Sequence, residues 1–251
     1  MTNYHTHSTF CDGRDAPEAM VAAAIEKGFS AIGFSSHSDM LADPAAYRAE
    51  IRRLAGVYAG RIRILLGLEA ELAKPYSRIP GEYDYVIGSH HFITAPDGGG
   101  FAFDHKPEIL ADGVREHFGG DAPAFVKAYY AAIRSTLGLD FEIVGHLDLV
   151  RKFNKKYPFF DEDAAWYREE LENTADAIAM SGKLVEVNTG AISRGWMDDA
   201  YPSPIFRRLL RERGVRFVLS SDAHSTEAID CAFDRFGNAE AYVEKPFPDE
   251  R

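Results

Sequence analysis

The stretch "NYHTHSTFCDG", residues 3–13, places His5 and His7 two positions apart and follows them with Asp12. In a β-strand, side chains two residues apart point to the same face. A strand here would therefore bring two imidazoles together, with a carboxylate just beyond its end. Such a pair can bind one metal ion, but two histidines also fit a half-buried strand without any metal. The rest of the chain has to decide between these interpretations.

Length and composition limit the class of protein. With 251 residues, 46% of them hydrophobic, the chain can form one domain over residues 1–251. No apolar run reaches the roughly 20 residues that cross a bilayer, and no secretory signal pattern is present. Two cysteines do not suggest a disulfide framework, so we expect a cytoplasmic protein without a membrane partner. A net charge of −11 argues against a nucleic-acid partner, whereas bound metals would still permit a phosphorylated substrate.

Apolar runs alternate with amphipathic stretches along the chain. Together with the opening strand, six runs predict seven buried strands, at 31–36, 62–68, 83–89, 141–146, 183–188 and 215–221. Helical patterns occupy 15–28, 44–59, 122–137, 161–181, 203–213 and 225–236, and the glycine-rich segment 94–104 is typical of an exposed loop. This alternation predicts an α/β protein with a parallel sheet. Seven strands favour a closed or nearly closed barrel, and a doubly wound open sheet is the alternative.

Histidines and carboxylates recur at or just after the carboxyl ends of the predicted strands. In parallel α/β folds this edge is where functional sites are built. Since His90 and His91 are neighbours, only one of them should face such a site. Asp148 is either a ligand or a residue that orients a ligand imidazole, while His105 and His117 lie outside the pattern. The candidate metal ligands are His5, His7, Asp12, His37, Glu69, His90, His146, Asp222 and His224.

Nine donors exceed the needs of one ion, because a catalytic zinc-like site uses about three protein ligands. Two or three clustered ions fit better, with a carboxylate such as Glu69 bridging a pair. Mixed imidazole and carboxylate donors suit Zn, Fe or Mn. Clustered divalent ions suit the hydrolysis of a phosphate ester, because they activate water and stabilise charge on the phosphoryl oxygens. The sequence contains no nucleophile elbow, P-loop or dinucleotide-binding motif.

An ordered set of motifs carries a family resemblance. It consists of "HTHSTFCDG", "GFSSHSD", "GLEAE", "IGSHHF", "VGHLDLVRKF", "VEVNTG" and "SSDAH", spread over residues 3 to about 237. In this order the motifs resemble the PHP (polymerase and histidinol phosphatase) family of metal-dependent phosphoesterases, and most of all its histidinol-phosphatase branch. The resemblance implies a distorted (β/α)7 barrel of the TIM type that binds three divalent transition-metal ions.

Carried over by motif, the resemblance implies three sets of metal ligands. The first is His5, His7, Glu69 and Asp222, the second is Glu69, His90 and His146, and the third is Asp12, His37 and His224. Many histidinol phosphatases of this family have a histidine where Asp12 stands, and aspartate can also bind metal. Among these residues Glu69, Asp222 and His224 are predicted to be catalytic.

Phosphate oxygens that face away from the metals need a cation. Arg194 and Arg151 both follow strand ends, and a guanidinium can bind a phosphate through two parallel hydrogen bonds. Trp196 and Tyr201 either shape the pocket or serve packing. The ammonium and imidazole of a substrate such as L-histidinol phosphate need polar partners, for which the candidates are His91, Glu186, Asp148 and Glu71.

The candidate metal ligands therefore predict a hydrolase with a small phosphoester substrate, and the family resemblance implies a phosphatase that acts on L-histidinol phosphate in histidine biosynthesis. One alternative keeps the fold and metals but hydrolyses nucleotides or other small phosphoesters. An amidohydrolase also opens with two such histidines, but it usually needs a lysine carbamate where the third strand here offers Glu69. A metal-stabilised binding module would need no open coordination position.

Overall fold

The computed structural model describes residues 1–79, 81–238 and 242–247. Its main sheet contains seven strands: β1 Thr2–Asn3, β2 Ala31–Phe34, β3 Arg63–Glu71, β4 Tyr85–Ser89, β7 Ile143–Val144, β8 Leu184–Asn188 and β9 Phe217–Ser220. Neighbours in space are also neighbours in chain order, and each pair is parallel. A parallel bridge between Thr6 and Ala223 joins the first strand segment to the last. The sheet is thus a nearly closed barrel, which confirms the predicted (β/α)7 arrangement over an open sheet.

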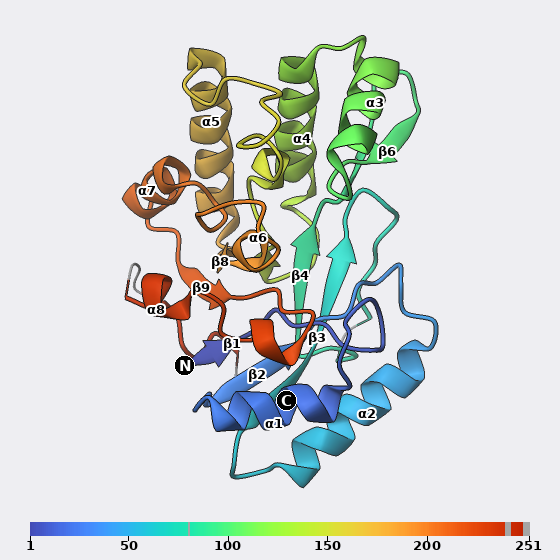
Figure 1. The fold of residues 1–251 in the computed structure, drawn as a ribbon, viewed down its shortest axis with the longest axis vertical. Helices are drawn as coiled ribbons and strands as arrows, with labels where there is room; N and C mark the ends of the chain where they lie inside the picture. The colour runs from blue at the N-terminus through green and yellow to red at the C-terminus, as the bar shows by residue number, and fades with distance from the viewer. Residues whose placement is uncertain (80, 239–241, 248–251) are drawn as a thin grey trace.

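Helices connect the strands and cover the outside of the barrel (Figure 1). They are α1 Pro17–Glu26, α2 Pro44–Val57, α3 Pro107–Phe118, α4 Ala122–Thr136, α5 Ala165–Ser181, α6 Gly190–Ser193, α7 Pro204–Glu212 and α8 Phe233–Phe236, with short 3₁₀ turns η1 Leu149–Arg151 and η2 Thr226–Ala228. Helix α1 packs on β2 and α2 on β3, while α3, α4 and α5 stand side by side. Among the described helices, none combines the length and apolar character that a bilayer crossing requires.

Local sequence explains why two of the helices begin where the pattern predicts. The carboxylate of Asp43 accepts a hydrogen bond from the Ala46 amide at the start of α2, and Asp121 does the same for Ala124 at the start of α4. These caps satisfy amides that have no partner within the helix. Proline in the first turn of each helix already has a helical φ.

Three segments differ from the sequence-based expectation. Residues 94–104 are not simply an exposed loop, because strands β5 Phe92–Thr94 and β6 Gly100–Ala102 pair antiparallel around a glycine-rich turn. Helix α3 follows this hairpin and was not expected. The predicted helix 225–236 contains only the turn η2 and the four-residue α8. Ala232, with φ 57°, interrupts it, because a left-handed residue cannot continue an α-helix.

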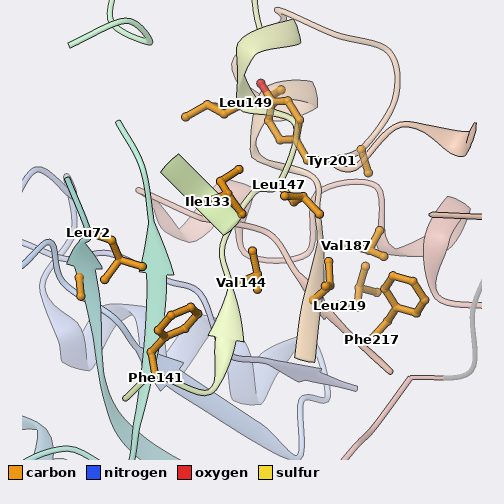
Figure 2. Packing of buried hydrophobic residues seen from close by; sticks show 14 of the residues in the cluster. Leu72, Ile133, Phe141, Val144, Leu147, Leu149, Val187, Tyr201, Phe217 and Leu219 are labelled. Atoms are coloured by element: carbon orange, nitrogen blue, oxygen red, sulfur yellow. The ribbon is translucent and has the colours of Figure 1, made fainter. Parts of the chain in front are cut away.

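The strands divide their apolar side chains between two packing layers. Alternate residues face opposite sides of a strand, so Ile32 and Val86 pack outward with the helices in the larger core cluster. Figure 2 shows part of this outer layer, including Val144, Val187 and Leu219. The inner layer is a separate cluster made of Tyr4, Ala31, Leu65, Tyr85, Ile87, Ile143, Leu184, Val218 and Phe247.

Inside the barrel, the fully buried ring of Tyr85 lies across the two strands before its own. A Cβ atom at Gly33 would come within 2.1 Å of its hydroxyl, and one at Gly67 within 2.3 Å of its ring. The Tyr85 hydroxyl donates to the Tyr4 carbonyl, and the ring stacks on Phe247 with centroids 4.7 Å apart. One large ring therefore requires glycine at two positions of the barrel wall.

We expect Gly67→Ala to lower the free energy of unfolding by about 1–3 kcal/mol, because the added methyl group must displace the Tyr85 ring. Gly56→Ala is the matched control. Gly56 lies near the end of α2, and an added Cβ would meet no heavy atom within 4 Å. Alanine there should be neutral or stabilise the protein by up to about 1 kcal/mol. Chemical denaturation of both variants measures the difference, and equal stabilities would contradict this packing.

Candidate metal centre and substrate cleft

The carboxyl ends of the barrel strands bring histidines and carboxylates together. All but one of the predicted ligands lie in this cluster. His146 belongs to it through Nε2, which lies 2.8 Å from Oε1 of Glu69. Three sets of side chains have ligand atoms within 4.8 Å of one another: His5, His7 and Asp222; His37, Glu69 and His91; and His7, Asp12, His37 and His224.

The surroundings of His5 show that the cluster fits a metal ion. Nδ1 of His5 lies 3.1 and 2.9 Å from the two carboxylate oxygens of Glu186, so in the neutral ring that metal binding requires, this nitrogen carries the proton. Its Nε2 then presents a lone pair to Nε2 of His7 at 3.1 Å and to Oε2 of Glu69 at 3.2 Å. A metal ion between these atoms would be bound by lone pairs from both imidazoles and from the carboxylate. The donor set therefore fits divalent metal binding.

Glu69 lies at the centre of the cluster, with a side chain only 1% exposed. Its Oε2 is 2.8 Å from Nδ1 of His37, while its Oε1 is 3.4 Å from Nε2 of His91. Burial raises the pKa of Glu69, but His37, His5 and His91 outweigh burial and hold it well below its usual value. An ionised carboxylate with each oxygen turned to a different set of imidazoles is suited to bridge two ions.

The structure places His91, rather than His90, in this cluster. His90 points outward, where its Nε2 lies 3.3 Å from the hydroxyl of Thr136 on α4. Burial lowers the pKa of His90 to about 4, so the ring is neutral. The prediction of His90 as a ligand is corrected accordingly. Odd-numbered residues at the end of β4 continue the inner face on which Tyr85 lies, and His91 is the next of them.

Glu186 lies behind the cluster and outside the substrate cleft, contrary to the prediction of a substrate contact. It is fully buried, and its carboxylate accepts hydrogen bonds from the His146 amide and the Asn188 side chain as well as from His5. Burial raises the pKa of Glu186, but His5 and His146 outweigh it and lower the pKa. The side chain thus orients the His5 ring toward the cluster.

Asp148 is held by residues of other elements, and within the described part of the chain no hydrogen bond joins it to His146. It is fully buried and accepts hydrogen bonds from the hydroxyls of Tyr130 and Tyr167 and from the Ser203 amide at 3.0 Å. These contacts tie the segment after β7 to α4, α5 and the start of α7. They hold the loops at this end of the barrel together.

The two predicted phosphate-binding arginines differ in position. Arg194 lines the cleft, where its guanidinium donates to both oxygens of Asp222 at 3.2 Å and lies 2.9 Å from Nδ1 of His224. Burial raises the pKa of Asp222, but Arg194 together with the histidines of the cluster outweighs burial, and the pKa is well below its usual value. Arg151 instead pairs with Glu162 at 2.6 Å and does not line this cleft. Only Arg194 is placed to meet a phosphate.

A cleft of about 310 Å³ opens over the cluster. Trp196 and Tyr201 both line it, and Figure 2 shows Tyr201 with its hydroxyl directed away from the strands. This hydroxyl is buried and finds no hydrogen-bond partner in the described part of the chain. The wall residues that the sequence pattern missed include Asp104, His105 and Lys152, which follow the hairpin or the turn after β7 rather than a predicted strand end.

A family model, described as "PHP domain", matches residues 3–190. The chain belongs to the PHP family. This PHP protein is 32% identical to a Deinococcus radiodurans protein named "Probable histidinol-phosphatase", over 91% of this chain and 88% of the relative. It is 24% identical to the histidinol-phosphatase of Bacillus subtilis, over 92% of this chain and 96% of the relative.

Solved structures share the fold of this PHP protein. A candidate histidinol phosphatase from Listeria monocytogenes superposes with a TM-score of 0.82 at 20% identity, over 94% of this chain and 100% of that chain. A histidinol phosphate phosphatase from Lactococcus lactis, complexed with zinc, L-histidinol and phosphate, gives 0.65 at 22% identity, over 96% and 94% of the two chains.

The neighbouring histidines provide a matched test of the metal centre. We expect His91→Gln to reduce metal affinity and activity by at least the 10- to 100-fold typical of residues that only support a ligand. His90→Gln should retain both within about threefold, because His90 faces α4. Metal content after gel filtration and turnover of a phosphoester give the two readouts. Loss of metal in His90→Gln alone would reverse the assignment.

Glu186→Gln tests the group behind His5. An amide cannot accept all the hydrogen bonds that the carboxylate accepts, so the His5 ring loses its fixed orientation, and metal affinity should fall about 10- to 100-fold. Competition with a chelator measures this. Glu162→Gln, which removes the charge paired with Arg151 outside the cleft, is the control and should leave metal affinity unchanged. Equal affinities in both variants would contradict the role of Glu186.

Proposed function

We propose that this PHP protein is a metal-dependent phosphomonoesterase that hydrolyses L-histidinol phosphate to L-histidinol and phosphate. The observation that carries the proposal is the convergence of imidazoles on Glu69 at the floor of the cleft, with Arg194 beside them. The names of the relatives in D. radiodurans and B. subtilis support this substrate, as does the zinc, histidinol and phosphate complex of the L. lactis protein. The activity would belong to histidine biosynthesis.

We further propose three divalent ions, with Zn, Fe and Mn as candidates. When bound, such ions lower the pKa of water and neutralise charge on the phosphoryl oxygens. The proposed ligand sets are His5, His7, Glu69 and Asp222; Glu69, His91 and His146; and Asp12, His37 and His224. Apart from the replacement of His90 by His91, these are the sets implied by the family motifs.

The side chains around the cluster have separable tasks. Arg194 supplies a guanidinium to phosphoryl oxygens, and its contacts with Asp222 and His224 keep it at the cleft. The unpaired hydroxyl of Tyr201 offers a further donor on the same wall. Glu69, which we propose to be catalytic together with Asp222 and His224, is the member of the cluster most closely surrounded by imidazoles.

Metal removal and a substrate panel test the proposal. Purified protein should carry more than one equivalent of transition metal, and chelation should abolish hydrolysis. In metal-reconstituted protein, kcat/KM for L-histidinol phosphate should exceed that for p-nitrophenyl phosphate by at least about tenfold, or roughly 1.4 kcal/mol of transition-state stabilisation. Full activity without metal would contradict the metal chemistry. A clear preference for a nucleotide or sugar phosphate would favour the alternative phosphoesterase function.

A further inference from the structure

The cleft wall beyond the metal cluster carries three carboxylates that a substrate could meet: Asp39, Glu71 and Asp104. Two of them are already engaged. Asp39 pairs with Lys74 at 2.7 Å. The two oxygens of Glu71 accept hydrogen bonds from the Ala73 amide at 2.9 Å and the His91 amide at 2.8 Å.

Asp104 differs from Glu71 because only one of its carboxylate oxygens is held, and from Asp39 because its side chain is more buried, 16% exposed against 31%. Nζ of Lys152 donates to the backbone carbonyl of Asp104 at 2.6 Å and to its Oδ2 at 3.1 Å. Within the part of the chain that the structure describes, no hydrogen bond or ion pair reaches Oδ1. The side chain is 16% exposed and lines the cleft. Lys152 thus fixes Asp104 and leaves an acceptor available to a ligand.

The position of Asp104 relative to the metal cluster matters for the substrate. Burial raises its pKa, but His91, Lys152 and His146 outweigh burial and lower it, so the carboxylate is ionised and lies within electrostatic reach of the cluster. In L-histidinol phosphate, the carbon that bears the ammonium is bonded directly to the ester methylene. When the phosphate lies over the cluster, the ammonium must therefore lie close to it as well.

We propose that Asp104 binds the ammonium group of the substrate and selects phosphate monoesters that carry a cation on the carbon next to the ester methylene. The inference rests on the proposed phosphatase function and narrows its substrate class. A charge-assisted hydrogen bond to the free Oδ1 supplies the attraction. A substrate without the cation leaves this partly buried carboxylate with Lys152 alone, so binding of such a substrate gains nothing from it.

The test compares two substrates in two variants. L-Histidinol phosphate and 3-(imidazol-4-yl)propyl phosphate differ only in the ammonium group. Asp104→Asn should lower kcat/KM for the first by about thirtyfold, the size expected for a hydrogen bond to a charged group, and for the second by less than about threefold. The control is Asp97→Asn on the same hairpin, which removes the charge that faces His117 at 3.0 Å away from the cleft and should change neither value.

The outcomes separate the two proposals. If Asp104→Asn lowers both substrates equally, or neither, the inference fails while the phosphatase function stands. If the wild-type protein does not hydrolyse L-histidinol phosphate, the proposed function fails and takes the inference with it.

A measurement on the wild-type protein covers the case in which Asp104→Asn does not fold. L-Histidinol should inhibit hydrolysis of p-nitrophenyl phosphate at least about tenfold more strongly than 3-(imidazol-4-yl)propan-1-ol, which lacks the ammonium. Equal inhibition by the two alcohols would overturn the inference.

Discussion

The buried carboxylate of Glu69 sets the main constraint on this structure. A nearly inaccessible negative charge is strongly unfavourable unless positive charge or donors surround it. Here those partners are imidazoles from segments that are far apart in the sequence, including His5, His37 and His146. They can meet at one carboxylate only if the sheet curls, and the contact of His7 with Asp222 at 3.3 Å further requires the first and last strands to approach. The charges of the site are therefore balanced only when the barrel is closed.

The same constraint explains why the outer partners of the cluster are charged. In a neutral His5 ring, Glu186 fixes the proton on Nδ1 and leaves a lone pair on Nε2, while Arg194 neutralises part of the charge of Asp222. A metal ion at the centre would be met by several imidazole and carboxylate donors at short range. Because these donors come together only in the folded chain, the binding free energy of the metal also contributes to folding stability. Metal binding and stability of the strand ends should be coupled for this reason.

Much of the fold and of the cluster could be predicted from the sequence, because the patterns that mark a strand and its end lie within a few residues of one another. A strand shows its period of two, its apolar runs and the polar residue that follows it, and these signals were enough to locate seven strands and most residues of the cluster. Which face of a strand points into the barrel could not be predicted in the same way. The choice between His90 and His91 depends on which residues of β4 face inward, and that is decided by Tyr85 filling the space left by Gly33 and Gly67 on other strands. The sequence near residue 90 does not indicate which of the two histidines faces inward.

The roles of Glu186 and Asp148 could not be predicted for a related reason. Both lie near strand ends, where carboxylates are expected to face the site. In the folded chain, however, residues remote in sequence bury both side chains completely. Asp104 and Lys152 show the reverse case, in which a loop residue and a turn residue meet across 48 positions and form part of the cleft wall. Partners of this kind become visible only when the chain is folded.

The cluster and the facing wall of the cleft differ in how far their residues can be substituted without disturbing the rest of the site. The metal cluster sits on strand ends that the barrel holds in place, so altering a ligand disturbs charges that several strands share. The facing wall, by contrast, includes Phe92, Ala102 and Asp104 from the β5–β6 hairpin and the segment that follows it, outside the seven-stranded sheet. Substitutions there can alter which ester fits while the cluster keeps its geometry. Under the proposed function, the hydrolytic chemistry depends on the closed barrel, whereas substrate selection depends on the inserted hairpin and its contact with the turn after β7.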